Sequence, residues 1–128
     1  MSAALLVFLG AGLGGVLRHA VNLIAARMLG LGFPWGTLAV NVAGSLAMGL
    51  IVGWLAFRAD QPWSGPARLF LATGVCGGFT TFSAFSLDAV SLWERGALGL
   101  SAAYLAGSVL ASLGALLLGL AAMRGLAS

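Results

Sequence analysis

The chain has 128 residues, of which 61% are hydrophobic and 7% are charged, and its mean hydropathy is +1.08. A water-soluble domain of this size cannot bury so much apolar surface, so the composition indicates an integral membrane protein. The formal net charge of +3 comes from scattered arginines without a basic stripe, which argues against a nucleic-acid partner. Cys76 is the only cysteine, which excludes an intramolecular disulfide and a multi-cysteine metal site.

Four stretches are long and apolar enough to cross a bilayer, since one span needs about 20 residues. We expect an all-α protein with spans at about 3–28, 36–57, 67–93 and 97–123, which together form a single domain, 1–128. Glycine and proline mark the short connections, and short connections make neighbouring helices antiparallel. The first stretch is not expected to be a cleavable signal, because no basic segment precedes it.

Glycines recur at four-residue spacing in three of the spans, as Gly10 and Gly14, Gly49 and Gly53, and Gly74 and Gly78. This spacing lets helix backbones approach closely, and its simplest interpretation is ordinary intramembrane packing. A bundle of only four helices encloses little interior. Polar residues in all four spans therefore point to a dimer, in which a second chain would cover them.

Arg18 is the residue of the first span whose insertion into the bilayer costs the most free energy. If that span is centred near Gly14, Arg18 lies roughly 6 Å above the centre at 1.5 Å per residue. The hydrocarbon half-thickness is about 15 Å, and an arginine at the centre costs about 2.5–3.5 kcal/mol or more to insert. Either the side chain reaches up to the interface, or it forms a cationic vestibule that concentrates anions at a pore mouth.

The arginines are divided evenly between the two ends of the predicted bundle, with Arg58, Arg68 and Arg124 at the end that holds the N-terminus, and Arg18, Arg27 and Arg95 toward the other. An excess of lysine and arginine on the cytoplasmic side normally fixes the orientation of a membrane protein. A chain with equal numbers of arginines at its two ends lacks the charge excess that would fix its orientation. We therefore expect that the chain can insert in both orientations.

Asn41 lies in the middle of the second span, within GTLAVNVAGS. A polar side chain at this depth faces the interior of a bundle by default. Its amide has two N–H groups, which can donate hydrogen bonds to a dehydrated anion. Asn41 is thus a candidate ligand for an ion in the membrane.

The third span contains GVCGGFTTFSAFSLD, residues 74–88, which is rich in glycine and hydroxyl groups. An adjacent glycine pair weakens a helix, and the hydroxyls of Thr80, Thr81 and Ser83 can compete for the freed backbone groups. We predict a helix break near the bilayer midplane. Unsatisfied carbonyls cost several kcal/mol each at this depth, so a cation between two such breaks, held by Gly77 and Thr80, would satisfy them. A glycine kink that only packs helices is the alternative.

An aromatic stripe of Phe79, Phe82 and Phe85 runs through the same segment. Such a stripe is usually core or lipid contact, but here it alternates with threonine and serine, and a phenyl ring turned edge-on presents its positive edge to an anion. Dehydrating a small anion costs on the order of 20 kcal/mol in an idealised Born treatment, against about 0.5–1.5 kcal/mol for an aromatic pair. Hydrogen-bond donors must therefore supply most of the replacement for water.

Tyr104, Ser108 and Ser112 recur every four residues in the fourth span and therefore share one helical face. A ladder of hydroxyl groups can pass an ion from site to site. Alternatively, the serines can bond back to carbonyl groups of their own helix. Both interpretations remain open at the level of the sequence.

Three segments together resemble the Fluc (CrcB) family of fluoride channels: GLGGVLRHA, GTLAVNVAGSLAMG and GVCGGFTTFSAFSLD, in the first, second and third spans. With the length and the four-span layout, the resemblance covers essentially the whole chain. It implies an antiparallel, dual-topology homodimer in a prokaryotic plasma (inner) membrane. It also implies two fluoride pathways along the subunit interface and passive, electrogenic fluoride efflux that lowers toxicity.

The resemblance implies roles for individual residues. The family holds one central structural sodium ion with carbonyl groups that correspond here to Gly77 and Thr80, and its first-span arginine corresponds to Arg18 at the vestibule. The implied fluoride pathway contains Asn41, Phe82, Phe85, Tyr104, Ser108 and Ser112, to which we add Thr81 and Ser83 because they interleave with the phenylalanines. His19 stands where tyrosine is common in the family, and Asp88 where glutamate is common.

Other functions fit the sequence less well. The chain carries no carboxylate pair, no Ser-His-Asp set and no metal-ligand spacing, so we expect no enzyme. A small four-span, dual-topology drug or cation antiporter needs an intramembrane carboxylate, for which Asp88 is the only candidate. Asp88 could equally pair with Arg18 or cap the polar segment. A purely structural subunit would explain the packing glycines but not Asn41 with the serine ladder.

Overall fold

The structure is a computed structural model that describes residues 2–127, and over this range it is helical with no strand. In chain order its elements are α1 (Ala3–Leu29), α2 (Trp35–Ala56), α3 (Ser64–Arg68), η1 (Leu69–Cys76), α4 (Gly77–Phe79), α5 (Phe82–Glu94) and α6 (Leu98–Ala127). Four stretches of the described chain are long and apolar enough to cross a membrane: α1, α2, the run from α3 to α5, and α6. The predicted all-α, four-span architecture is confirmed.

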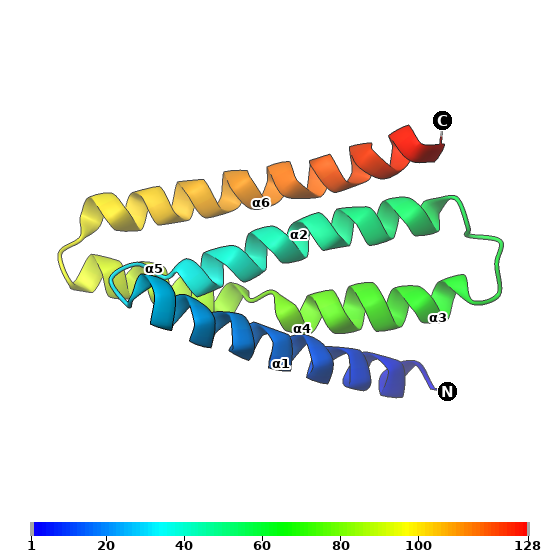
Figure 1. Cartoon of the computed structure of the whole chain (residues 1–128), viewed down its shortest axis with the longest axis horizontal. Coiled ribbons are helices and arrows are strands. Elements are labelled where there is room, and N and C mark those ends of the chain that lie inside the picture. The colour runs from blue at the N-terminus through cyan, green and yellow to red at the C-terminus, as the bar shows by residue number, and fades with distance from the viewer. Residues whose placement is uncertain (1, 128) are drawn as a thin grey trace.

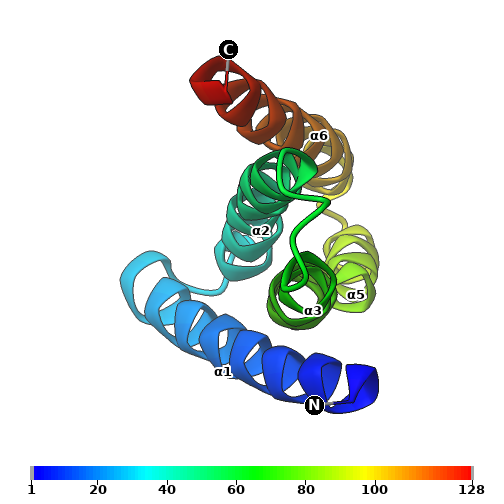
Figure 2. The ribbon, with the colours of Figure 1, turned by 90° about the vertical axis from the view of Figure 1, so that its right-hand side faces the viewer.

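The four spans run up and down along the long axis of the molecule, and both ends of the chain lie at the same end of the bundle (Figure 1). α2 packs mainly against α6, and α1 packs mainly against η1 and α4. Viewed end-on, α1 and α6 lie at opposite edges, with α2 and the third span between them (Figure 2). The helices therefore form an open array rather than a bundle closed around a centre.

Glycines allow α1 and the third span to lie backbone against backbone. A methyl group added at Gly14 would come within 2.8 Å of the backbone nitrogen of Phe79, and one added at Gly78 within 2.8 Å of the Cα atom of Ala11. A methyl group at Gly10 would also meet the backbone of the third span. The regular spacing of these glycines thus builds a close helix seam, as the sequence predicted.

A cluster of buried hydrophobic side chains lies at the end of the molecule where α5 turns into α6. It contains Phe85 and Leu92 of α5 and Tyr104 of α6, with Phe33 of the α1–α2 connection packed against it. The ring centroids of Phe85 and Tyr104 are 5.1 Å apart, and Phe33 meets Tyr104 edge-on at 5.4 Å. These contacts tie the second half of the third span to α6 and to the neighbouring loop.

Candidate functional site

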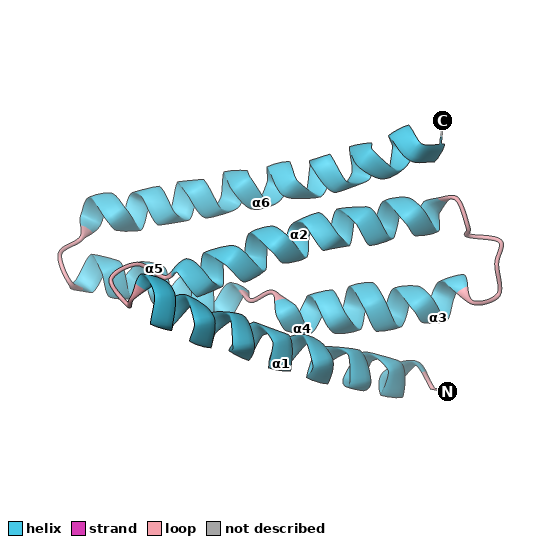
Figure 3. Ribbon diagram, viewed as in Figure 1, coloured by secondary structure: helices cyan, strands magenta, loops and turns pink. Residues whose placement is uncertain are grey.

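The third span is broken in its middle, as predicted. The helical backbone of α4 ends after Phe79, and Thr80 (φ −85°, ψ 160°) and Thr81 (φ −153°, ψ 121°) are extended before α5 begins at Phe82. The two threonines form the short loop between α4 and α5 in Figure 3. Before the break, η1 has π-helical hydrogen bonding, a pattern that is frequent at functional sites.

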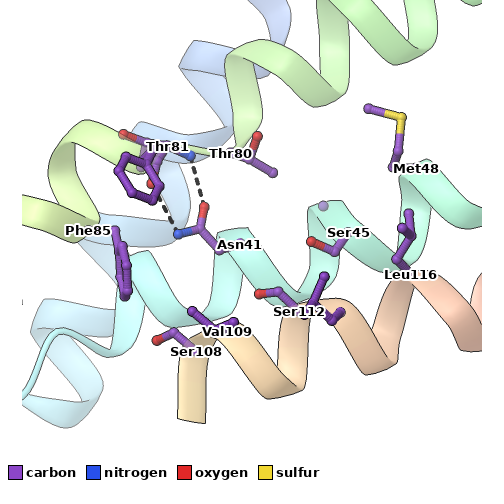
Figure 4. A pocket seen from close by; sticks show the side chains of 13 residues that line it. Asn41, Ser45, Met48, Thr80, Thr81, Phe85, Ser108, Val109, Ser112 and Leu116 are labelled. Atoms are coloured by element: carbon purple, nitrogen blue, oxygen red, sulfur yellow. Dashed lines mark hydrogen bonds between the residues drawn. The ribbon is translucent and has the colours of Figure 1, made fainter. Parts of the chain in front are cut away.

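Asn41 of α2 pairs with the backbone of the break. Its Oδ1 accepts a hydrogen bond from the Thr81 N–H at 2.8 Å, and its Nδ2 donates to the Thr81 carbonyl at 3.1 Å (Figure 4). The side-chain amide therefore satisfies both backbone groups of a residue that has left the helix. An unsatisfied group at membrane depth costs several kcal/mol, so Asn41 stabilises the break. The sequence pattern had suggested only a role as an ion ligand.

The hydroxyl groups of the break cap the two helix ends. Thr80 Oγ1 donates to the Cys76 carbonyl at 2.9 Å, and Thr81 Oγ1 accepts from the Ala84 N–H at 3.1 Å as the N-cap of α5. Ser83 Oγ lies 3.3 Å from Thr81 Oγ1. The Thr81 cap gives the Ala84 N–H a partner that the interrupted helix cannot supply, whereas the Cys76 carbonyl also accepts from the Thr80 N–H at 3.0 Å. Thr81 and Ser83 thus have local structural partners, and their predicted place in the pathway stays a prediction.

The break leaves carbonyl groups without their usual helical donors, and those of Gly77 and Thr80 are among them. In a continuous helix the Gly77 and Thr80 carbonyls would accept from the N–H groups of Thr81 and Ala84. Here the Thr81 N–H donates to Asn41, and the Ala84 N–H donates to Thr81 Oγ1. The two carbonyls singled out from the sequence are therefore among the four, of residues 77–80, whose i+4 donors do not bond to them in the described chain. Oxygen donors of this kind suit a hard cation such as sodium.

A pocket of about 330 Å³ lies beside the break, in the groove between α2 and α6 (Figure 4). Its lining comes from three elements: Asn41, Gly44, Ser45 and Met48 of α2; Thr80, Thr81, Phe82 and Phe85 around the break; and Ser108, Val109, Ser112, Leu113 and Leu116 of α6. None of these side chains is charged. The pocket brings together most of the predicted pathway residues, but neither Tyr104 nor Ser83 lines it.

Ser45 lines the pocket but was not singled out from the sequence. Its position four residues after Asn41 places both side chains on one face of α2, and this spacing is the signal that could have found it.

Ser108 and Ser112 of α6 line the pocket with hydroxyl groups that make no hydrogen bond within the described residues. Ser108 is buried, with 4% of its surface exposed, and its Oγ has no hydrogen-bond partner within the described residues. Ser112, one turn on, lines the same pocket, and no partner for its hydroxyl is found in residues 2–127. The alternative that these serines bond back to their own helix is therefore not what the structure shows.

The two phenylalanines differ in their surroundings. Phe85 is 7% exposed and packs against Tyr104, whereas Phe82 is 78% exposed and points away from the core of the chain. Their ring centroids are 5.7 Å apart with an interplanar angle of 54°. Both rings line the pocket, so one edge of the pocket is built from a fixed ring and the other from a ring that this single chain leaves uncovered.

Tyr104 has a different partner from the serines. Its hydroxyl donates to Asp88 Oδ2 at 3.2 Å, which gives Asp88 a partner that the sequence did not indicate. Asp88 lines a second pocket of about 480 Å³ at the loop end of the molecule, together with Asn22, Thr37, Ser91 and Arg95 among others. The Tyr104 hydroxyl is thus directed toward this second pocket. The predicted series of Tyr104, Ser108 and Ser112 is therefore divided between two sites.

Arg18 lies on α1 and lines neither pocket. Within the described chain its guanidinium makes no hydrogen bond or ion pair, so the suggested pairing with Asp88 does not occur in a single copy. The arginine at the second pocket is Arg95, whose Nη2 donates to the Gly32 carbonyl at 3.0 Å. The vestibule role of Arg18 stays a prediction.

The fold and the site define a small multi-pass membrane protein in which a broken helix opens onto an uncharged, hydroxyl-lined groove. Residues 5–120 match the family model described as CrcB-like protein, Camphor Resistance (CrcB), and the chain belongs to this family.

Three curated relatives cover nearly all of the chain. "Fluoride-specific ion channel FluC 2" of Nitrobacter hamburgensis is 58% identical over 122 residues, which are 94% of this chain and 95% of the relative. "Fluoride-specific ion channel FluC" of Rhodopseudomonas palustris (strain BisB5) is 56% identical over 120 residues, or 94% and 95%. The protein of the same name from Beijerinckia indica is 55% identical over 126 residues, or 98% and 99%.

Proposed function

We propose that this chain is a fluoride-selective ion channel through which fluoride leaves the cytoplasm passively and electrogenically, so that its toxicity falls. The observation that carries this proposal is the buried Ser108 hydroxyl without a partner, in an uncharged pocket bounded by the rings of Phe82 and Phe85. Hydroxyl donors and phenyl edges replace water around a small anion. The fluoride-specific names of the relatives support the same ion.

Passive conduction accords with the charges near the pocket. No acidic side chain lines the groove beside the break, and Asp88 accepts a hydrogen bond from Tyr104 at a different site. A proton-coupled antiporter needs an ionisable group that the substrate and the proton share. A channel needs none, because the negative interior of the cell drives anions outward.

We further propose that two copies associate in antiparallel orientation in a prokaryotic plasma membrane. The exposed Phe82 ring beside the pocket and the open array of helices support a partner that covers this face. A single structural sodium ion would be held by the Gly77 and Thr80 carbonyls of the two copies. When bound, it would supply positive charge that satisfies these oxygens and fixes the two breaks relative to each other.

Reconstituted liposomes test the channel. Vesicles loaded with potassium fluoride and given valinomycin should lose fluoride when the protein is present, and chloride-loaded vesicles should retain their anion. Efflux should depend on valinomycin, because an electrogenic pathway needs a compensating cation. Protein-containing vesicles that hold fluoride as firmly as empty ones would exclude the channel, and fluoride-independent drug–proton exchange would instead support an antiporter.

A further inference from the structure

Ser45 is the polar residue of the α2–α6 groove that the proposed pathway leaves without a role. It is half-buried, lines the pocket beside the break, and is one helical turn beyond Asn41 on the same face of α2. Its hydroxyl makes no hydrogen bond in the described part of the chain. In Figure 4 Ser45 of α2 and Ser112 of α6 lie on neighbouring helices, and their hydroxyl oxygens point to the same side.

The other polar side chains on this side of the pocket have protein partners, although one N–H of Asn41 is not used in the described chain. The Asn41 amide pairs with both backbone groups of Thr81, and the Thr80 hydroxyl donates to the Cys76 carbonyl. The Thr81 hydroxyl accepts from the α5 backbone. Among residues 2–127, the hydroxyl groups of the pocket that find no hydrogen-bond partner are therefore those of Ser45, Ser108 and Ser112.

We infer that Ser45, together with Ser108 and Ser112, forms a halide-binding subsite in the groove between α2 and α6. This inference rests on the proposed fluoride conduction and adds a site and a residue to it. The three hydroxyls come from both walls of the groove, and each can rotate its proton toward an anion that lies beside it. A buried hydroxyl without a partner is costly, so an anion that accepts from Ser108 removes a defect of the empty groove.

The subsite is bounded on its far side by apolar residues. Beyond Ser45 and Ser112 the pocket is lined by Met48 of α2 and Leu116 of α6 (Figure 4), and Leu113 also belongs to the lining. A dehydrated ion that moved farther would find no donor there, so Ser45 and Ser112 are the last hydrogen-bonding groups in this direction. Because no cation lines the pocket, the subsite holds the anion only with neutral donors, which favours rapid release.

Ser45→Ala tests the subsite in the fluoride efflux assay. We expect the efflux rate to fall about tenfold, the effect of losing one hydrogen bond to a charged acceptor. The fluoride concentration that gives half-maximal flux should rise as well, whereas Ser45→Thr, which keeps the hydroxyl, should restore the wild-type rate to within about threefold. If the Ser45→Ala variant aggregates on purification, the Ser45→Gly variant, which also lacks the hydroxyl, is used in its place.

Ser101→Ala is the matched control. It removes a buried serine hydroxyl from α6 that donates to the Ala89 carbonyl at 2.8 Å and does not line the groove. Its thermal unfolding temperature should fall while its fluoride efflux stays at the wild-type rate. If a folded Ser45→Ala or Ser45→Gly variant has the wild-type efflux rate and the wild-type fluoride concentration for half-maximal flux, the proposed subsite is wrong. The proposed channel function is not affected by that result. Absence of efflux from the wild-type protein would overturn both.

Discussion

At the residue scale, Asn41 pairs with the break and also lines the pocket through which we propose that fluoride moves. Its amide oxygen and one of its N–H groups are used by Thr81, which leaves the second N–H available to an ion in the adjacent pocket. A substitution that removes the amide should therefore affect folding and conduction together. Removal of a free hydroxyl in the same pocket should affect conduction alone.

Asn41→Ala should lower both the stability of the protein and its fluoride efflux. The Thr81 N–H and carbonyl would lose their partners, and each unsatisfied buried group costs about 1–3 kcal/mol. Thermal unfolding in detergent measures the first effect, and the liposome assay measures the second. Ser112→Ala is the control, because its hydroxyl has no protein partner. It should reduce efflux at an unchanged unfolding temperature.

The two readouts separate the two roles of Asn41. An Asn41→Ala protein that unfolds at the wild-type temperature would show that the pairing with Thr81 does not stabilise the break. Wild-type efflux in the same variant would remove Asn41 from the pathway, even if the protein were less stable.

The sequence predicted which residues carry polar groups at membrane depth, but not with which groups they pair. Asn41 and Thr81 are 40 residues apart, and Tyr104 and Asp88 are 16 residues apart on different helices. These pairings depend on how the spans pack, which residue spacing along one helix does not encode. Ser108 and Ser112 were found because their spacing of four is a local property of α6.

At the scale of the elements, the seam between α1 and the third span depends on glycine. Gly14 faces the third span so closely that an added methyl group would meet the carbonyl of Val75 and the nitrogen of Phe79. Gly15, the next residue, has open space where its methyl group would stand. These adjacent positions differ in packing but share a helix and a depth in the membrane.

Gly14→Ala should therefore destabilise the protein by about 1–3 kcal/mol, the usual cost of overpacking, because backbone atoms cannot move aside as a flexible side chain can. Gly15→Ala should be neutral or stabilising by up to about 1 kcal/mol, since alanine favours the helix over glycine. Thermal or denaturant unfolding in detergent compares them. Equal unfolding curves for the two variants would contradict the close seam.

The four spans and the broken third helix could be predicted because each has a local cause: apolar runs of sufficient length, and glycines beside hydroxyl residues. The break itself lies slightly later than the glycine pair. The helix continues through Gly78, which packs against Ala11, and ends at Thr80 and Thr81 instead. The π-helical hydrogen bonding of η1 has no counterpart in the pattern of LFLATGVC and could not have been predicted from it.

At the scale of the whole molecule, a single chain leaves the groove beside the break open on one side. Its groove opens beside Phe82, which is 78% exposed, and α1 and α6 stand at opposite edges without closing around a core. A second copy in the opposite orientation would cover this face only if the chain inserts both ways in comparable numbers. The proposed assembly therefore depends on the charges at the two ends.

Orientation can be measured with one cysteine. In a Cys76→Ala background, Ala59→Cys places a thiol in the connection between α2 and α3, at the end of the bundle that holds the N-terminus. Because the arginines are balanced, a membrane-impermeant maleimide added outside intact cells should label about half of the molecules. Complete labelling, or none, would show a single orientation and would exclude an antiparallel pair.

The same labelled protein tests whether charge balance is the cause. Gln61→Arg adds a cation beside Ala59, so it should hold that end in the cytoplasm and reduce labelling from outside. Leu31→Arg adds the same charge at an exposed position in the opposite connection and should raise labelling instead. Both shifts should remove antiparallel pairs and lower fluoride efflux per chain. If labelling stays at half in both variants, packing between the two copies, rather than the arginines, sets the orientation.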